Sequence, residues 1–532
     1  MFIFITCVNY LKGGNQVTYI INDKKSFYDL CDTLSGKVSF NEKLNRAVSD
    51  NDEFIIDLKE TVALETPIII KKPIHMKGNG VTLNGKTESA FVINSGNVVI
   101  QGFIIDKIVR SVIIDALDQK IENILLSDIT INDPGYGMGF NIGSSESYGK
   151  IINTTIENCT VNSGYDEADS LKTGIFDGAM GFNISAACPA IEREDDIIGA
   201  EVDGLYIRNC KVLGPRRYGI NLLVGTSIPQ PGTDFLSQKS RIIDCAVRNV
   251  KVLDCEFDYC REMAVTLSCS CINNYGSVLE YLEIARCRAV YGISGIGFSG
   301  AGPFIPTSVA RNMGMRHGSM HDNELIMMDL PVNEPSCCIA LVAARCEGFA
   351  GIEVYDCFVE DVDIYNNTII NADMAFMIAC ANSMGDEAVS LSDNHISDIR
   401  IYNNHIKDAR TVFTFMAAYA EGRRFDWNWG WRKNDYRFAE LSKDHAPTIK
   451  FFGNSISGLD CHDNDINGCA NEIVAVAALG RGHALMKDNR ICDGISYHDN
   501  RFERSEGHIN IRGAYYSDWV QDLGGNIVEI KK

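Results

Sequence analysis

The stretches MGFNIG (138–143), MGFNIS (180–185) and YGINLL (218–223) are three copies of one short strand. Two weaker copies follow at AVTLSC (264–269) and YGISGI (291–296). Upstream of each copy lies a second signature with a turn residue at its centre, namely Asp128, Asn158, Asn209, Asp254 and Arg286. Short apolar strands that repeat with turns of this type are typical of a solenoid. The pattern predicts an all-β protein built as a parallel β-helix.

The repeat extends in both directions, from VTLNG (81–85) to ISYHDNRFER (495–504), which predicts about twelve coils. We predict an N-terminal cap over residues 1–70, with short helices at 24–34 and 41–48, and one continuous β-helix domain over residues 71–532. Later coils carry asparagines that we place at the same turn position as Asn158 and Asn209, because asparagine tolerates a left-handed backbone. They are Asn323, Asn367, Asn404, Asn464 and Asn500.

Charge and hydropathy limit the kinds of partner that we expect this protein to bind. The 532 residues carry a net charge of −21, which argues against nucleic acid or an anionic membrane surface as a partner. No apolar run approaches the roughly 18 residues of a membrane span. The start, MFIFITCVNYLK (1–12), lacks a basic region and a small-residue cleavage site, so we expect an opening strand and a cytoplasmic protein.

Cysteine usage agrees with that location. There are 19 cysteines, none in a pair with metal-finger spacing. Cys159, Cys210, Cys255 and Cys287 occupy the same place in four units, so we expect them to stack as reduced, buried thiols.

A polar line is predicted on the repeated strand. Alternation sends Phe140 and Ile142 inward and Asn141 outward. The same register points Asn183, Asn221, Thr266 and Ser294 outward, at about 4.8 Å per coil. We interpret Asn141, Asn183 and Asn221 as candidate substrate-binding residues.

We expect charged residues and one tyrosine beside this line, over four coils. They are Tyr136, Asp166, Glu167, Arg216, Arg217, Arg261 and Glu262. The unit at Met180 also carries about thirteen extra residues, DEADSLKTGIFDGA (166–179), which include Asp169 and Lys172. Paired carboxylates supply the acid and base of glycosidic cleavage. A lysine among arginines could instead act as the base of a lyase, and clustered acids could hold calcium. No other cofactor is predicted.

Long segments follow the repeated strand at 186–200, 226–241, 300–319, 381–395 and 420–447. Because they leave one edge of a stacked sheet, we expect them to wall a groove. The last one holds Trp429 and two further tryptophans beside four arginines, which suits sugar stacking or a subunit interface equally. Arg311, Arg316 and His317 are weaker candidates for lining this same groove.

The stretch IENCTVNSGYDEADSLKTG (156–174) resembles the active-site segment of polygalacturonase-type glycosidases, which belong to the pectate-lyase-like right-handed β-helix superfamily. The resemblance implies that Asp166 and Glu167 match the paired acids of that family, and that Lys172 lies in its Lys-Ser-Gly segment. The third acid of the family and its downstream basic pair have no counterpart here. The coils with His-Asp-Asn (321–323, 462–464, 498–500) also resemble those of inulin fructotransferases.

Together these observations predict an enzyme that cleaves glycosidic bonds of an oligo- or polysaccharide. Asp166, Glu167, Asp169 and Glu262 would supply acid/base hydrolysis, and Arg217 and Arg261 would bind the substrate. Two alternatives stay open. One is a polysaccharide lyase or fructotransferase-like enzyme that uses Lys172. The other is a non-catalytic, tailspike-like glycan binder, for which a trimer, or otherwise a dimer, is expected.

Overall fold

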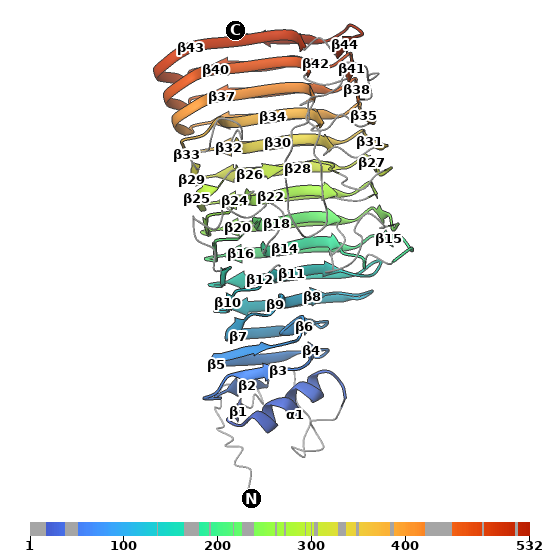
Figure 1. The fold of residues 1–532 in the computed structure, drawn as a ribbon, viewed down its shortest axis with the longest axis vertical. Helices are drawn as coiled ribbons and strands as arrows, with labels where there is room; N and C mark the ends of the chain where they lie inside the picture. Colours follow the sequence, from blue (N-terminus) through green and yellow to red (C-terminus); the bar gives the residue numbers. More distant parts are fainter. Residues whose placement is uncertain are drawn as a thin grey trace, which may run out of the picture.

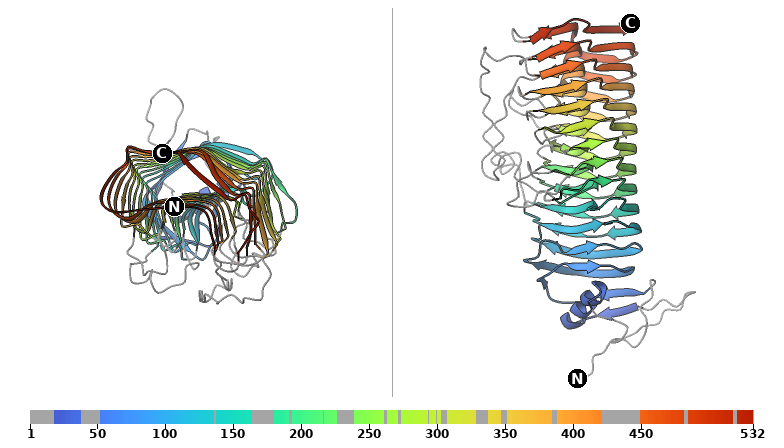
Figure 2. Two further views of the ribbon diagram at one scale, coloured as in Figure 1. Left: turned by 90° about the horizontal axis from the view of Figure 1, so that it is seen from above. Right: turned by 90° about the vertical axis from the view of Figure 1, so that its right-hand side faces the viewer.

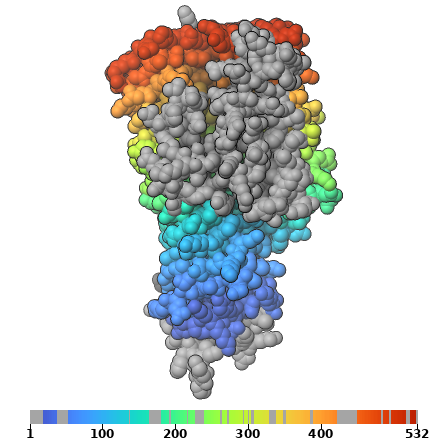
Figure 3. Space-filling model, viewed as in Figure 1, coloured from blue at the N-terminus to red at the C-terminus, as the bar shows by residue number. Residues whose placement is uncertain are grey.

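The computed structural model describes residues 18–37, 52–135, 137–163, 180–190, 193–215, 217–225, 239–260, 263–270, 273–292, 294–298, 300–302, 307–327, 337–346, 351–383, 388–420, 449–480, 484–516 and 520–531. They form a right-handed parallel β-helix, an elongated column with the N-terminus at one end and the C-terminus at the other (Figures 1 and 3). The predicted fold class is therefore confirmed. The predicted opening strand and the predicted helix at 41–48 lie outside the described residues.

The strands form four stacks, in which each strand pairs in parallel with its counterpart one coil away, and the coils from β12 to β35 contribute one strand to each stack (Figure 2). The first stack contains β1 (Thr18–Ile21), β2 (Glu53–Ile56), β5 (Ile74–Gly85), β7 (Val98–Asp106), β9 (Lys120–Ser127), β12 (Lys150–Glu157), β16 (Glu201–Arg208), β20 (Ala246–Leu253), β24 (Val278–Ala285), β28 (Gly314–His321), β32 (Phe358–Tyr365), β36 (His395–Tyr402), β39 (Ser455–His462), β42 (Arg490–His498) and β45 (Ile527–Lys531). The short second stack contains β3 (Val62–Leu64), β10 (Thr130–Asn132), β13 (Thr160–Asn162), β17 (Lys211–Leu213), β21 (Glu256–Asp258), β25 (Arg288–Gly292), β29 (Glu324–Met327) and β33 (Thr368–Ile370).

The third stack holds the repeated strands from which the fold is predicted. It contains β4 (Ile68–Ile70), β6 (Phe91–Ile93), β8 (Arg110–Asp115), β11 (Met138–Ser144), β14 (Met180–Ala187), β18 (Tyr218–Gly225), β22 (Met263–Ser270), β26 (Ser294–Phe298), β30 (Cys337–Cys346), β34 (Met374–Ser383), β37 (His405–Ala420), β40 (Asp465–Gly480) and β43 (Arg501–Tyr516). The last three strands also continue the second stack. This run of pairings agrees with the prediction of about twelve coils.

The fourth stack is a separate sheet of very short strands. It contains β15 (Ile197–Ile198), β19 (Ile242–Ile243), β23 (Asn274–Tyr275), β27 (Val309–Arg311), β31 (Ile352–Tyr355), β35 (Val389–Ser392), β38 (Ile449–Phe452), β41 (Ala484–Lys487) and β44 (Val520–Asp522). Three of these strands, β15, β27 and β35, lie inside segments that the sequence treats as long loops. A strand of two to four residues is too short to show the period of two that marks a strand, so that part of the loop prediction is wrong.

The interior is a continuous apolar core. Phe140 and Ile142 belong to it, and the ring of Phe140 stacks on that of Phe182 with centroids 4.8 Å apart, so the predicted inward register is confirmed. At the N-terminal end, α1 (Lys24–Leu34) buries Phe27, Leu30 and Leu34. The helix was predicted with these bounds.

The turns between the first and second stacks follow the predicted signature. All five turn residues have a left-handed backbone with φ between 53° and 56°: Asp128, Asn158, Asn209, Asp254 and Arg286. The next residue in four of these turns is a stacked, buried cysteine, and Cys159, Cys210, Cys255 and Cys287 are all free thiols as expected.

One register prediction in these turns is wrong by one residue. The left-handed position of the later coils is held by Asp322, Asn366, Asn403, Asp463 and Asp499. Asn323, Asn367, Asn404, Asn464 and Asn500 come one residue later and continue the cysteine column instead. The backbone N–H of Cys287 donates to Oδ1 of Asn323 at 2.9 Å, which joins the two runs. Doublets such as Asn366-Asn367 hide which of the two asparagines makes the turn.

Candidate functional site

The outer side of the third stack is the predicted site. All five predicted long segments follow third-stack strands: β14, β18, β26, β34 and β37. The insertion over 166–179 falls between β13 and β14, so it enters the third stack from the opposite end of the strand. The sequence therefore attaches its least regular segments to both ends of one stack.

The predicted polar line is present in register. Asn141 pairs with Asn183, Asn183 with Asn221, and Asn221 with Thr266. The Asn183 Nδ2 donates to Asn141 Oδ1 at 2.7 Å, and the Asn221 Nδ2 donates to Asn183 Oδ1 at 2.9 Å. The three amides are only 3%, 2% and 6% exposed, so they form a buried ladder rather than an open polar surface. Their contact with a substrate stays a prediction.

The fifth member of the line differs from the expectation. Ser294 pairs with Met263, at the start of the strand, and Gly297 is the residue that pairs with Thr266. The copy at 291–296 was aligned on its tyrosine and glycine, but β26 begins only at Ser294 and Tyr291 belongs to β25. The hydrogen-bonding line therefore ends at Thr266.

Nine predicted site residues lie outside the described residues: Tyr136, Asp166, Glu167, Asp169, Lys172, Arg216, Arg261, Glu262 and Trp429. Their roles stay predictions. Arg217 is described, and its guanidinium lies over the ring of Tyr218, 4.9 Å from the centroid.

The points at which these segments join the described chain are known. Met138 pairs with Met180, and Tyr218 pairs with Met263. Tyr136 and Arg216 each precede such a strand start by two residues, and Glu262 precedes Met263 directly. The segment 164–179 ends directly before Met180. The strand starts Met138, Met180, Tyr218 and Met263 thus lie at one edge of the third stack, on four adjacent coils about 4.8 Å apart.

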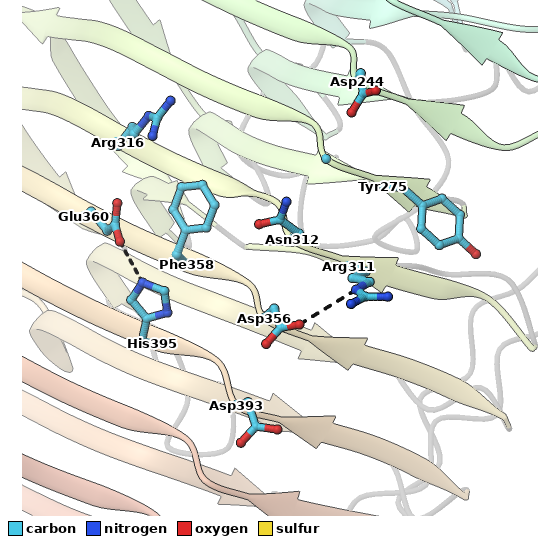
Figure 4. Close-up of a pocket in the computed structure, with 11 residues that line it drawn as sticks. Asp244, Tyr275, Arg311, Asn312, Arg316, Asp356, Phe358, Glu360, Asp393 and His395 are labelled. Carbon is cyan, nitrogen blue, oxygen red and sulfur yellow. Dashed lines mark hydrogen bonds and ion pairs between the residues drawn. The ribbon is translucent and has the colours of Figure 1, made fainter.

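A groove of about 680 Å³ lies elsewhere, between the fourth and the first stacks (Figure 4). We call it the turn groove, because five of its residues directly follow fourth-stack strands and have a left-handed backbone: Asp244, Gly276, Asn312, Asp356 and Asp393. Its other lining residues are Tyr275, Arg311, Arg316, Phe358, Glu360 and His395. Arg311 and Arg316 line this groove, which is a different one from the loop-walled groove for which they were predicted, and His317 stacks on Tyr281 and bonds to Asp361.

Several charges in the turn groove are paired. The Nε2 of His395 lies 2.7 Å from Oε1 of Glu360, and the His395 ring stacks on that of Phe358. Arg311 lies 3.8 Å from the carboxylate of Asp356. Gly314 makes room for Phe358, because a Cβ at residue 314 would lie 2.0 Å from the Phe358 carbonyl oxygen and 2.7 Å from Cδ2 of its ring.

Arg316 donates a hydrogen bond to the carboxylate of Glu280, and this carboxylate also accepts a hydrogen bond from Arg248. Burial raises the pKa of Glu280, but the hydrogen bonds from Arg248 and Arg316 outweigh burial and leave that pKa below its usual value. The three side chains come from β20, β24 and β28, so one carboxylate ties three coils together beneath the turn groove.

Sequence reasoning missed the turn groove because it missed the fourth stack. The signal is an aspartate that directly follows a very short strand, as in RIIDC (241–245), EVYDC (353–357) and SLSDN (390–394). Aligning these three segments would have placed Asp244, Asp356 and Asp393 in one column.

No family model and no curated protein sequence matches this chain. Among solved structures, a GH136 lacto-N-biosidase from Eubacterium ramulus is similar with a TM-score of 0.29 and 11% identity, over 69% of this chain and 60% of that protein. The periplasmic alginate epimerase AlgG gives a TM-score of 0.29 and 10% identity, over 84% and 85% of the two chains. A mannuronic-acid-specific polysaccharide family 6 lyase from human gut microbiota gives 0.28 and 8%, over 85% and 86%. This chain thus spans less than two thirds of the first of these proteins.

The described residues contain neither a metal-binding cluster nor a helix that could span a membrane. They contain no group of three or more His, Cys, Asp or Glu side chains arranged to hold a metal ion. Within the same residues, no helix has the length and apolar character needed to cross a membrane.

Proposed function

We propose that this protein is a carbohydrate-active enzyme that cleaves glycosidic bonds of an oligo- or polysaccharide at the third stack. The observation that carries the proposal is the register of four strand starts, at Met138, Met180, Tyr218 and Met263. Residues that are more than 90 positions apart in the sequence, such as Asp166 and Glu262, thereby join adjacent or nearly adjacent coils. A solenoid does not need an insertion such as 166–179 for packing, so its acids are available for chemistry.

The chemistry follows from the residue types. In hydrolysis one carboxylic acid protonates the leaving oxygen, and a second carboxylate activates water or attacks the sugar carbon. Asp166, Glu167, Asp169 and Glu262 would supply these groups. Arg216, Arg217 and Arg261 would bind sugar hydroxyl or carboxylate groups from the same edge, with Tyr136 and Trp429 stacking on sugar rings. The buried amide ladder would hold the coils of this edge in register.

Replacing Asp166 by Asn and Glu167 by Gln in one variant tests the assignment. Each change preserves shape but removes the proton-transfer group, which commonly contributes 10²–10⁴-fold to the rate. We expect turnover on the best substrate of a glycan panel to fall by about that factor, with an unchanged thermal transition. Asp195→Asn is the matched control. Asp195 is exposed and comes after β14, whereas Asp166 and Glu167 come before that strand. Retained turnover in the double variant would remove these acids from the mechanism.

A lyase would use different groups. If Lys172 removes a proton beside a carboxylate that arginine neutralises, Lys172→Ala abolishes activity and the product carries a double bond that absorbs ultraviolet light. A hydrolase with the assignment above gives a saturated product and tolerates Lys172→Ala better than the loss of Asp166 and Glu167.

A further inference from the structure

We propose that the turn groove is a second glycan-binding site, which holds a neutral, hydroxyl-rich stretch of chain apart from the third stack. The ligand class rests on the proposed function, because both sites would then bind the same polymer. The groove itself stands on described residues alone (Figure 4).

The groove offers hydrogen-bond acceptors that are not in use. Within the described part of the chain, the side chains of Asp244, Asn312 and Asp393 form no hydrogen bond or ion pair. Each follows a strand end in the same column of turns, and each lines the groove. Unpaired carboxylate and amide oxygens accept hydrogen bonds from ligand hydroxyl groups.

The groove also offers donors. The side chains of Arg311 and Arg316 are 55% and 45% exposed, and a guanidinium has five N–H groups. Arg316 spends part of this capacity on Glu280, and Arg311 stands 3.8 Å from Asp356. Both guanidinium groups therefore keep N–H groups that can donate to a ligand.

The balance of charge selects a neutral ligand. Four carboxylates, those of Asp244, Asp356, Glu360 and Asp393, outnumber the two arginines and would repel a polyanion. A polycation would meet Arg311 and Arg316 among these carboxylates, so part of its charge would face like charge. A sugar hydroxyl both donates and accepts, so it can satisfy both kinds of side chain without carrying charge.

Aromatic groups and length point to a sugar chain rather than a small polar solute. Tyr275 and Phe358 lie on either side of Asn312 in Figure 4, and aromatic faces pack against the apolar faces of sugar rings. The turns that line the groove belong to five consecutive coils, from Asp244 to Asp393. At about 4.8 Å per coil the groove is about 19 Å long, which suits several linked rings.

The test is calorimetric binding to the full chain with three sets of probes of similar size. The neutral set contains hexasaccharides of glucose, xylose, mannose and galactose. An oligogalacturonate is the anionic probe and a chitosan oligomer is the cationic probe. We expect a neutral probe to bind, and Tyr275→Ala and Arg311→Ala each to weaken its binding at least tenfold. Tyr291→Ala and Arg288→Ala are matched controls on β25, in the second stack, and should stay within twofold of the unchanged chain.

Asp393→Asn is a gentler variant, because asparagine tolerates the left-handed backbone at this position. It should weaken neutral binding several-fold and improve binding of the anionic probe, and it tests the groove even if Tyr275→Ala does not fold. All measurements are repeated on the Asp166→Asn, Glu167→Gln variant. Loss of turnover with retained groove binding, or absence of turnover altogether, then concerns the proposed function and not the groove. Failure of every neutral probe to bind at millimolar concentration, preference for a charged probe, or equal binding by groove and control variants would overturn the proposal.

Discussion

Buried asparagines hold the later coils together at the level of single residues. Asn404 is a typical member of the ladder. Its Oδ1 accepts from the backbone N–H and the Nδ2 of Asn367, and its own Nδ2 donates to the Ile364 carbonyl and to Asn464. A buried polar group without a partner is costly, so each amide depends on the next one. The cysteines of the earlier coils occupy the same place, and their thiols donate long, weak hydrogen bonds of 3.6 to 3.9 Å to carbonyl groups of the preceding coil.

Replacing Asn404 by Ala should therefore destabilise the protein. The change leaves the Asn367 donors and the Ile364 carbonyl without their partners, and we expect a loss of about 2–4 kcal/mol in the free energy of unfolding. Urea denaturation measures it. Asn403→Asp is the control, because Asn403 is exposed and aspartate also tolerates its left-handed backbone. Equal denaturation midpoints for the two variants would show that the ladder does not stabilise the coils.

At the scale of elements, the sequence predicted those with a strong local signal. The helix at Lys24–Leu34 follows Asp23, whose side chain caps it by accepting from the Ser26 N–H. The third-stack strands repeat nearly identical letters, so they reveal themselves by comparison. The fourth stack has neither signal, and the turn groove was missed together with it. Ser294 was misplaced because a shared tyrosine and glycine outweighed the true strand start.

The Arg248, Glu280 and Arg316 contacts link three first-stack strands, and Glu280→Gln should weaken this link. The Glu280 side chain is only 7% exposed, so its loss of charge leaves two guanidinium groups without their shared partner. We expect a cost of about 1–3 kcal/mol at neutral pH, measured by urea denaturation. Glu324→Gln is the control, because Glu324 pairs with Arg288 on the exposed second stack and should cost at most about 1 kcal/mol.

The contribution of Glu280 to the free energy of unfolding should decrease as the pH falls. Its pKa is lowered in the folded protein, so its contribution is present above the pKa of the unfolded chain and is lost as the pH falls through the folded value. The difference between the unchanged chain and Glu280→Gln should therefore shrink as the pH falls below about 4.3, the ordinary glutamate value. A constant difference from pH 7 to pH 3 would show that the charge of Glu280 is not what stabilises the strands.

At the scale of the whole molecule, the solenoid places segments that are far apart in the sequence on coils that stack directly on one another. That is why the sequence could predict that segments near Met138, Met180, Tyr218 and Met263 enter one edge. It could not predict where their side chains lie, because a connection without periodicity carries no register. The two ends also differ. The helix α1 covers the N-terminal coil, whereas Ile509 and Ile511 of β43, in core-facing register with Ile473 and Ala475, are 51% and 42% exposed.

We propose that Asp166 and Glu167 hydrolyse glycosidic bonds. Mass analysis of the products of a glycan panel digested in ¹⁸O-labelled water tests it most directly. Hydrolysis by the unchanged chain should give saturated products, each cleavage incorporating one ¹⁸O atom at a new reducing end, and the Asp166→Asn, Glu167→Gln variant should give about 10²–10⁴-fold less of them. Unsaturated products without the label, or no cleavage of any glycan, would contradict it.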